Sequence, residues 1–297
     1  MKTQRIRSSA FVPYARRQAV LAAFLAALLF SGCETLRGPA EASGGEDGQS
    51  PEVRLEPAAE PEAAPEHDDG VEGLYKGVLT AADGSGAFRL DIRNSAPDDI
   101  ELRGVYNGRG FSLSGRERFD PAYETYTYTF DGQAGGGSDA AGAEAAGEPV
   151  RIEFETSISI TGEIDSGNTT FRADGDPVNV NMMKESSDTL VRVYEGRYSG
   201  DSAGTWNFVR KGRSISGYYA GDGEGRFSGM LEPGNGGLRV WGVHGHLIAR
   251  GTVDDDGMAR GAWRFDKGAA YGETTAAAEY PDPGAEGANT WAGSRTL

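Results

Sequence analysis

Residues 150–160 read VRIEFETSISI, and apolar and polar side chains alternate along this stretch. The apolar side chains that share one face are Val150, Ile152, Phe154, Ile158 and Ile160. The residues between them carry charges or hydroxyl groups. A period of two is typical of a β-strand with one buried and one solvated face. The stretch therefore predicts antiparallel sheet.

The same alternation recurs through the body of the chain from residue 71 onward, for example over 88–92 and 126–130. No stretch after residue 34 combines a 3.6-residue apolar stripe with helix caps. Asn-Gly and Asp-Gly pairs recur between the alternating segments, and these residues accept the positive φ of hairpin turns. Glycine is frequent, with 45 residues among 297. We expect an all-β, Gly-rich antiparallel meander that forms a barrel or a sandwich.

An internal repeat divides this body. Glu72–Gly77 (EGLYKG) resembles Glu195–Gly200 (EGRYSG), and downstream of these segments Gly86–Leu90 (GAFRL) resembles Gly204–Phe208 (GTWNF). Conserved order with drifting spacing predicts two tandem, diverged β units. Their expected bounds are 71–185, with a low-complexity loop at 133–149, and 190–280, followed by a C-terminal tail at 281–297.

Residues 33–70 have a different composition, dominated by Pro, Glu, Ala and Gly, with few large apolar side chains. Such a segment buries too little surface to offset the entropy lost on ordering. We expect a disordered acidic tether in front of the β body.

The N-terminus combines three features. Residues 1–17 contain five basic and no acidic side chains, Ala19–Phe30 is an unbroken apolar run, and Cys33 is the only cysteine in the chain. Twelve apolar residues span about 18 Å as a helix, which is too short for a bilayer core of about 30 Å. The run therefore indicates a signal peptide over residues 1–32.

Ser31-Gly32-Cys33 after this run resembles the lipobox of bacterial lipoproteins, with Phe30 where that family usually has an aliphatic residue. The resemblance implies cleavage before Cys33 and palmitate-type acyl chains on it, so that the membrane is a partner. It also implies a place in the bacterial cell envelope. Glu34 follows the cysteine in place of the Asp associated with inner-membrane retention, which favours the outer membrane.

Charge narrows the function classes further. The formal net charge is -16, and it becomes -21 once the five basic residues of the signal are removed. Nucleic-acid binders need clustered Lys and Arg, so no nucleic-acid partner is expected. One cysteine excludes internal disulfides and cysteine metal clusters.

Motifs with possible chemistry have simpler explanations. Gly200–Gly204 fits the G-x-S-x-G nucleophile motif, but a strand follows it where a helix is required, so it predicts a turn. His244 and His246 alternate and are weak candidates for a metal site, for which a third ligand would have to come from elsewhere, such as Asp254–Asp256. Asp174–Asp176 and Asp254–Gly257 lack the spacing of a calcium loop and predict turns. No catalytic residue, metal or cofactor is expected.

Aromatic residues crowd the second unit, and Trp206, Trp241 and Trp263 are candidates to line a cavity if its sheet closes. Gly204-Thr205-Trp206 at the start of a strand resembles the first strands of avidin-like and lipocalin-like barrels over a few residues. The sequence thus predicts a non-catalytic binding or structural module. The alternatives are a ligand-binding barrel and an envelope hydrolase that uses carboxylates on strands.

Overall fold

A computed structural model describes residues 53, 55–93, 100–135, 148–234, 236–242, 247–254, 256–265 and 289–297. A 3-10 helix over Pro65–His67 precedes the strands. The first nine strands are β1 Gly73–Ala81, β2 Gly84–Ile92, β3 Ile100–Tyr106, β4 Arg109–Ser114, β5 Arg116–Asp120, β6 Thr125–Ala134, β7 Val150–Ser159, β8 Ile164–Ala173 and β9 Asp176–Lys184. The next eight are β10 Val191–Ser199, β11 Gly204–Lys211, β12 Ser214–Gly221, β13 Gly225–Leu231, β14 Gly237–Gly242, β15 Leu247–Val253, β16 Met258–Phe265 and β17 Thr290–Arg295. No helix in these ranges has the length and apolar character needed to cross a membrane.

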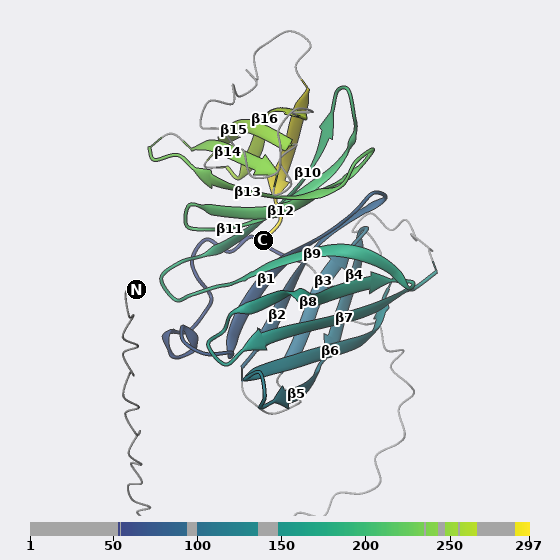
Figure 1. Cartoon of the computed structure of the whole chain (residues 1–297), viewed down its shortest axis with the longest axis vertical. Coiled ribbons are helices and arrows are strands. Elements are labelled where there is room, and N and C mark those ends of the chain that lie inside the picture. Colours follow the sequence, from purple (N-terminus) through teal and green to yellow (C-terminus); the bar gives the residue numbers. More distant parts are fainter. Residues whose placement is uncertain are drawn as a thin grey trace, which may run out of the picture. The chain divides into compact units, whose positions relative to one another are not determined.

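The first sheet is antiparallel and barrel-like. Its strand order is β4-β3-β2-β1-β9-β8-β7-β6-β5, so two meanders join where β1 pairs with β9. The sheet curves (Figure 1), and β4 approaches β6, with the Gly135 N–H donating to the Gly110 carbonyl at 3.0 Å. The predicted alternation is confirmed within β7, where Ile152, Phe154 and Ile158 lie in the core and Val150 packs against it. It is wrong for Ile160, which follows the end of the strand and is 43% exposed.

The second sheet, β10 to β17, is a closed eight-stranded antiparallel barrel. Closure occurs where β17 pairs with both β10 and β16. The two tandem β units are therefore confirmed, and both are barrel-like or closed. The prediction of a C-terminal tail over 281–297 is wrong for residues 290–295, because they supply the closing strand. The expected loop at 133–149 begins later than predicted, because Gln133 and Ala134 still pair within β6 and β7.

Strand register aligns the internal repeat four residues away from the alignment suggested by sequence. Gly77 lies opposite Phe88 in the first sheet, and Gly196 lies opposite Trp206 in the barrel. Tyr75 therefore corresponds to Tyr194, not to Tyr198. Each glycine makes room for an aromatic ring: a Cβ on Gly77 would lie 2.2 Å from the Phe88 ring, and one on Gly196 would lie 2.3 Å from the Trp206 ring. These contacts explain much of the glycine content of the strands.

The segment before β1 is not wholly a disordered tether. Residues 1–52 and 54 lie outside the described ranges, but Leu55 packs against a buried cluster of both sheets. Glu62 reaches Lys76 of β1 at 2.8 Å, and its N–H donates to Glu185 at 2.7 Å. The expected tether is therefore wrong for the residues from 55 onward that the structure describes. Their charged and polar groups bind the β body.

The barrel is attached to the first sheet through a small apolar cluster bordered by hydrogen bonds. The cluster consists of Val78, Ala87, Val191, Val193, Val209 and Leu297. Beside it the buried Asn207 amide donates to the Leu79 carbonyl at 2.6 Å and to the Thr80 hydroxyl at 2.9 Å. A buried donor or acceptor without a partner costs free energy, so these hydrogen bonds favour one alignment of β11 against β1.

Glu195 of β10 gives this contact a pH dependence. Burial raises the pKa of Glu195, and hydrogen bonds from Thr296 at 3.2 Å and Ser85 at 3.4 Å offset only part of this effect. The stabilisation from the protonated carboxyl is complete below about pH 4.5, the ordinary pKa of Glu, and is lost as pH rises through the higher folded-state pKa.

We therefore expect Glu195→Gln to match the wild type near pH 4 and to exceed its free energy of unfolding near pH 7. Urea denaturation at the two pH values measures this difference. Glu155→Gln, on the exposed face of β7, is the control. A Glu195→Gln protein that is less stable than the wild type at pH 7 would show that the charged form is the stabilising one.

Candidate functional site

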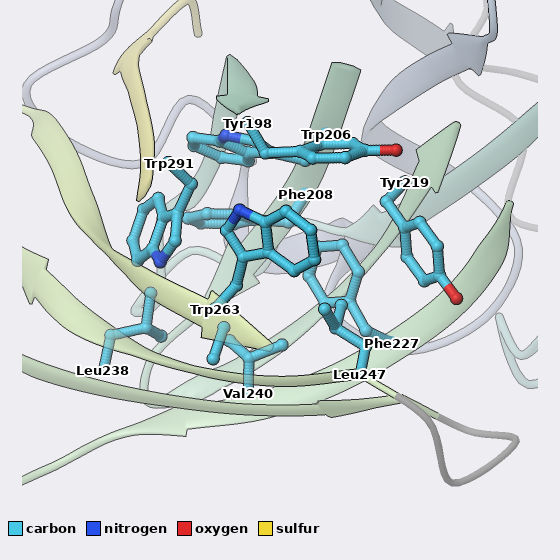
Figure 2. A pocket seen from close by; sticks show the side chains of 11 residues that line it. Tyr198, Trp206, Phe208, Tyr219, Phe227, Leu238, Val240, Leu247, Trp263 and Trp291 are labelled. Carbon is cyan, nitrogen blue, oxygen red and sulfur yellow. The ribbon is translucent and has the colours of Figure 1, made fainter. Parts of the chain in front are cut away.

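The interior of the β10–β17 barrel is the candidate site. Its walls combine aromatic and aliphatic side chains, and every strand of the barrel contributes to the core around it. The cavity is lined by Tyr198, Trp206, Phe208, Tyr219, Phe227, Leu238, Val240, Leu247, Ala249, Trp263 and Trp291. Figure 2 shows the aromatic rings converging on Trp263 from several strands.

Two of the three predicted tryptophans line this interior. Trp206 and Trp263 are 5% and 3% exposed, whereas Trp241 faces outward. On β14 the inward positions are Leu238 and Val240, so the alternation of the strand sends Trp241 to the opposite side. The prediction that Trp241 lines the cavity is therefore wrong.

The largest omission from the predicted set is Trp291 of β17. Its ring lies 5.1 Å from that of Trp206 in an edge-to-face arrangement. A usable signal was present: Thr290-Trp291-Ala292 repeats the small–Trp pattern of Thr205-Trp206 and Ala262-Trp263. Tyr198 is a second omission, and its ring lies 5.3 Å from that of Trp263.

All three inward indoles are hydrogen-bonded to the barrel backbone. Trp206 Nε1 donates to the Arg197 carbonyl at 3.0 Å, and Trp291 Nε1 donates to the Ala262 carbonyl at 3.3 Å. Trp263 Nε1 lies 3.2 Å from the carbonyls of Ser199 and Thr290. Buried Trp N–H groups need such partners, and here the barrel itself supplies them. These indoles therefore act as structural parts of the core.

The remaining cavity is small. Its volume is about 40 Å³, and its walls are apolar. A water needs roughly 10–15 Å³ of such space, and sites for small-molecule ligands commonly occupy about 300–1,000 Å³. The aromatic rings fill most of the barrel, so the cavity as it stands is too small for a sugar ring.

Two tyrosines lie together in this interior. Tyr198 and Tyr219 pack edge to face with ring centroids 6.4 Å apart. Burial raises the pKa of each phenol. Both hydroxyls therefore stay neutral at physiological pH and can act as hydrogen-bond donors, not as bases.

Three sequence motifs that we predicted to be turns do lie between consecutive strands. Gly200–Gly204 joins β10 to β11, and the Ser202 hydroxyl donates to Asp222 at 3.3 Å. Asp174 and Gly175 adopt positive φ angles of 51° and 88° between β8 and β9. Asp254 accepts the Met258 N–H at 2.7 Å within the β15–β16 turn.

Three predicted positions lie outside the described residues: Cys33, His244 and His246. In the part of the chain that the structure does describe, no three His, Cys, Asp or Glu side chains are grouped to hold a metal ion. Comparisons with protein-family models, with curated proteins and with solved structures found no match to this chain.

Proposed function

We propose that this protein is a lipid-anchored, non-catalytic interaction module of the bacterial cell envelope, attached by acyl chains on Cys33 and facing the outer membrane. Its role is to hold a rigid β body near the membrane and to bind another envelope component on the outer surface of that body. The filled interior of the barrel carries this proposal. A cavity of about 40 Å³ is too small for a ligand, so a partner would bind to the outer faces.

The attachment half of the proposal is supported by the basic N-terminus, the Ala19–Phe30 run and the lone Cys33. Two or three acyl chains anchor a protein stably, whereas one chain is marginal. The interaction half is supported by the contact between barrel and first sheet, where buried hydrogen bonds from Asn207 join an apolar cluster. Rigid elements present a binding surface at low entropic cost.

Cys33→Ser tests the attachment. The variant is expected to move from the membrane fraction to the soluble fraction, and the mature wild-type chain is expected to show the added mass of acyl chains. A control substitution at Ser31, Ser31→Ala, keeps a small residue before the cysteine and leaves the protein membrane-bound. A Cys33→Ser protein that remains fully membrane-bound would refute the lipid anchor.

A ligand-binding barrel is the second candidate, favoured by the neutral phenols of Tyr198 and Tyr219 beside an apolar cavity. Binding there requires the aromatic rings to move apart. It therefore predicts a ligand-dependent change in tryptophan fluorescence, because all four tryptophans of the chain lie on barrel strands.

A further inference from the structure

The outer face of the barrel over β14–β17 has a charge opposite to that of the chain. The chain has 45 acidic and 29 basic side chains, yet these four strands contain five arginines and no Asp or Glu. The inward positions hold apolar residues and glycine, so Arg239, Arg250, Arg260 and Arg264 alternate to the outside. We call these four residues with Arg197 of β10 the arginine face.

Strand register brings these arginines together. Arg239 lies directly opposite Arg250, and Arg260 and Arg197 both lie opposite Ala292 of β17, one on each side. Like charges that face each other across strands destabilise a sheet. Glu232 pairs with Arg239, but among the described residues no carboxylate pairs with Arg197, Arg250 or Arg260, which leaves these three charges available to an external anion.

Most of the arginine face lacks internal partners. Arg197, Arg250 and Arg260 are exposed. Among the described residues, no carboxylate oxygen lies within 4.0 Å of their guanidinium nitrogens, the distance limit for an ion pair. Arg239 does pair with Glu232. Elsewhere in the described chain, Arg93 and Arg151 reach carboxylates at 2.6 Å and 2.8 Å.

A hollow of about 690 Å³ runs along this face. Three small residues, which allow close approach to the backbone, are among those that line it: Gly251, Gly261 and Ala292. The other residues that line it include Arg250, Arg260, Thr252, Thr290 and Glu232, whose side chains end in guanidinium, hydroxyl and carboxylate groups. These groups can pair with anions and can also donate to and accept from neutral hydroxyls.

We infer that the arginine face binds an acidic polysaccharide, a chain that carries carboxylate or phosphate groups among many hydroxyls. This inference rests on the proposed function, since it names the partner of the interaction module. Charge complementarity supplies the anionic half, and the hydroxyl and carboxylate groups of the hollow supply the sugar half. A flat lipid surface would reach the protruding arginines but not the small residues between them, whereas an extended polymer can follow the hollow.

Binding of polygalacturonate to the full-length protein in a non-ionic detergent tests the inference, with neutral dextran as the matched uncharged polymer. The measurement is the dissociation constant by biolayer interferometry at about 50 and about 300 mM NaCl. We expect saturable binding of polygalacturonate that weakens with salt, and no binding of dextran.

The double variant Arg250→Glu/Arg260→Glu is expected to bind polygalacturonate at least about tenfold more weakly. Its control is Arg116→Glu/Arg118→Glu, which reverses two exposed arginines on β5, and it should change the affinity by less than about twofold. Both proteins should retain the wild-type melting temperature within a few degrees.

Three results would overturn the inference: equal binding of dextran, equal loss in the two double variants, or binding of phosphatidylglycerol vesicles or polyglutamate in preference to polygalacturonate. The lipid anchor is tested separately, because Cys33→Ser fractionation does not depend on the arginine face. Failure of polygalacturonate binding with normal release of Cys33→Ser would reject the partner and keep the anchor.

Discussion

Replacing Lys76 by methionine is expected to lower the free energy of unfolding by about 3–5 kcal/mol. The Lys76 ammonium is fully buried and lies 2.8 Å from both Glu185 and Glu62. Glu185 is also fully buried, and it accepts the Val191 N–H at 2.9 Å. Methionine keeps the length of the side chain but leaves the Glu185 carboxylate in the interior without its counter-ion.

The measurement is urea denaturation followed by far-UV circular dichroism. Lys76→Met/Glu185→Gln removes both charges and should recover part of the loss, because an apolar replacement of a whole buried pair is often near neutral. Arg151→Met is the control, since its pair with Asp131 has side chains 59% and 64% exposed and should leave the free energy of unfolding nearly unchanged. A Lys76→Met protein as stable as the Arg151→Met protein would show that this pair is not buried.

Trp291→Ala is expected to cost about 3–5 kcal/mol, the usual penalty for removing a buried tryptophan. The indole packs against Trp206 and lies on the strand that closes the barrel. In the wild type the Trp291 ring fills the space beside Gly251 and Gly261, where a Cβ on either glycine would lie within 2.7 Å of it. Removing the ring leaves that space empty.

Trp241→Ala is the matched control, because it removes the same side chain from the outward face of the same barrel. We expect it to cost no more than about 1 kcal/mol. Guanidinium denaturation followed by tryptophan fluorescence compares the two variants. Equal losses, or a larger loss at Trp241, would contradict the inward placement of Trp291.

Much of the fold was predictable because period-two alternation directly encodes which face of a strand is buried. Ile152, Phe154 and Ile158 were placed correctly on this basis. Closure of the second sheet was not predictable in the same way, because β17 is separated from β16 by residues 266–289 and is mostly small and polar. Its pairing with β10 depends on contacts far apart in the sequence.

The candidate site was predicted only in part for a related reason. Composition marks a tryptophan as apolar, but only the phase of its strand decides whether it faces in or out. Trp206 and Trp263 are in phase with the barrel core, whereas Trp241 is one residue out of phase with Leu238 and Val240. The phase of β14 rests on two residues, too few to fix from sequence alone.

The prediction of a disordered tether was wrong from residue 55 onward because it rested on the scarcity of large apolar side chains. Composition does not show which polar groups will contact the β body. Burial raises the pKa of Glu62, but the hydrogen bond and charge of Lys76 outweigh it and hold that pKa below its usual value. Glu62 contacts Lys76 and Arg89, Asp68 accepts from Ser187, and Leu55 packs beside the apolar cluster, so these residues are held without a core of their own. The arginine face was hidden similarly, since it emerges only from strand register.

The most direct test of the filled barrel is a titration with the apolar fluorophore N-phenyl-1-naphthylamine, with the emission of the four tryptophans as the readout. We expect no saturable binding and no quenching, because the filled interior leaves a cavity of about 40 Å³. Saturable one-to-one binding that quenches tryptophan emission, and that Trp263→Phe weakens while Trp241→Phe does not, would contradict it and identify the barrel interior as a ligand site.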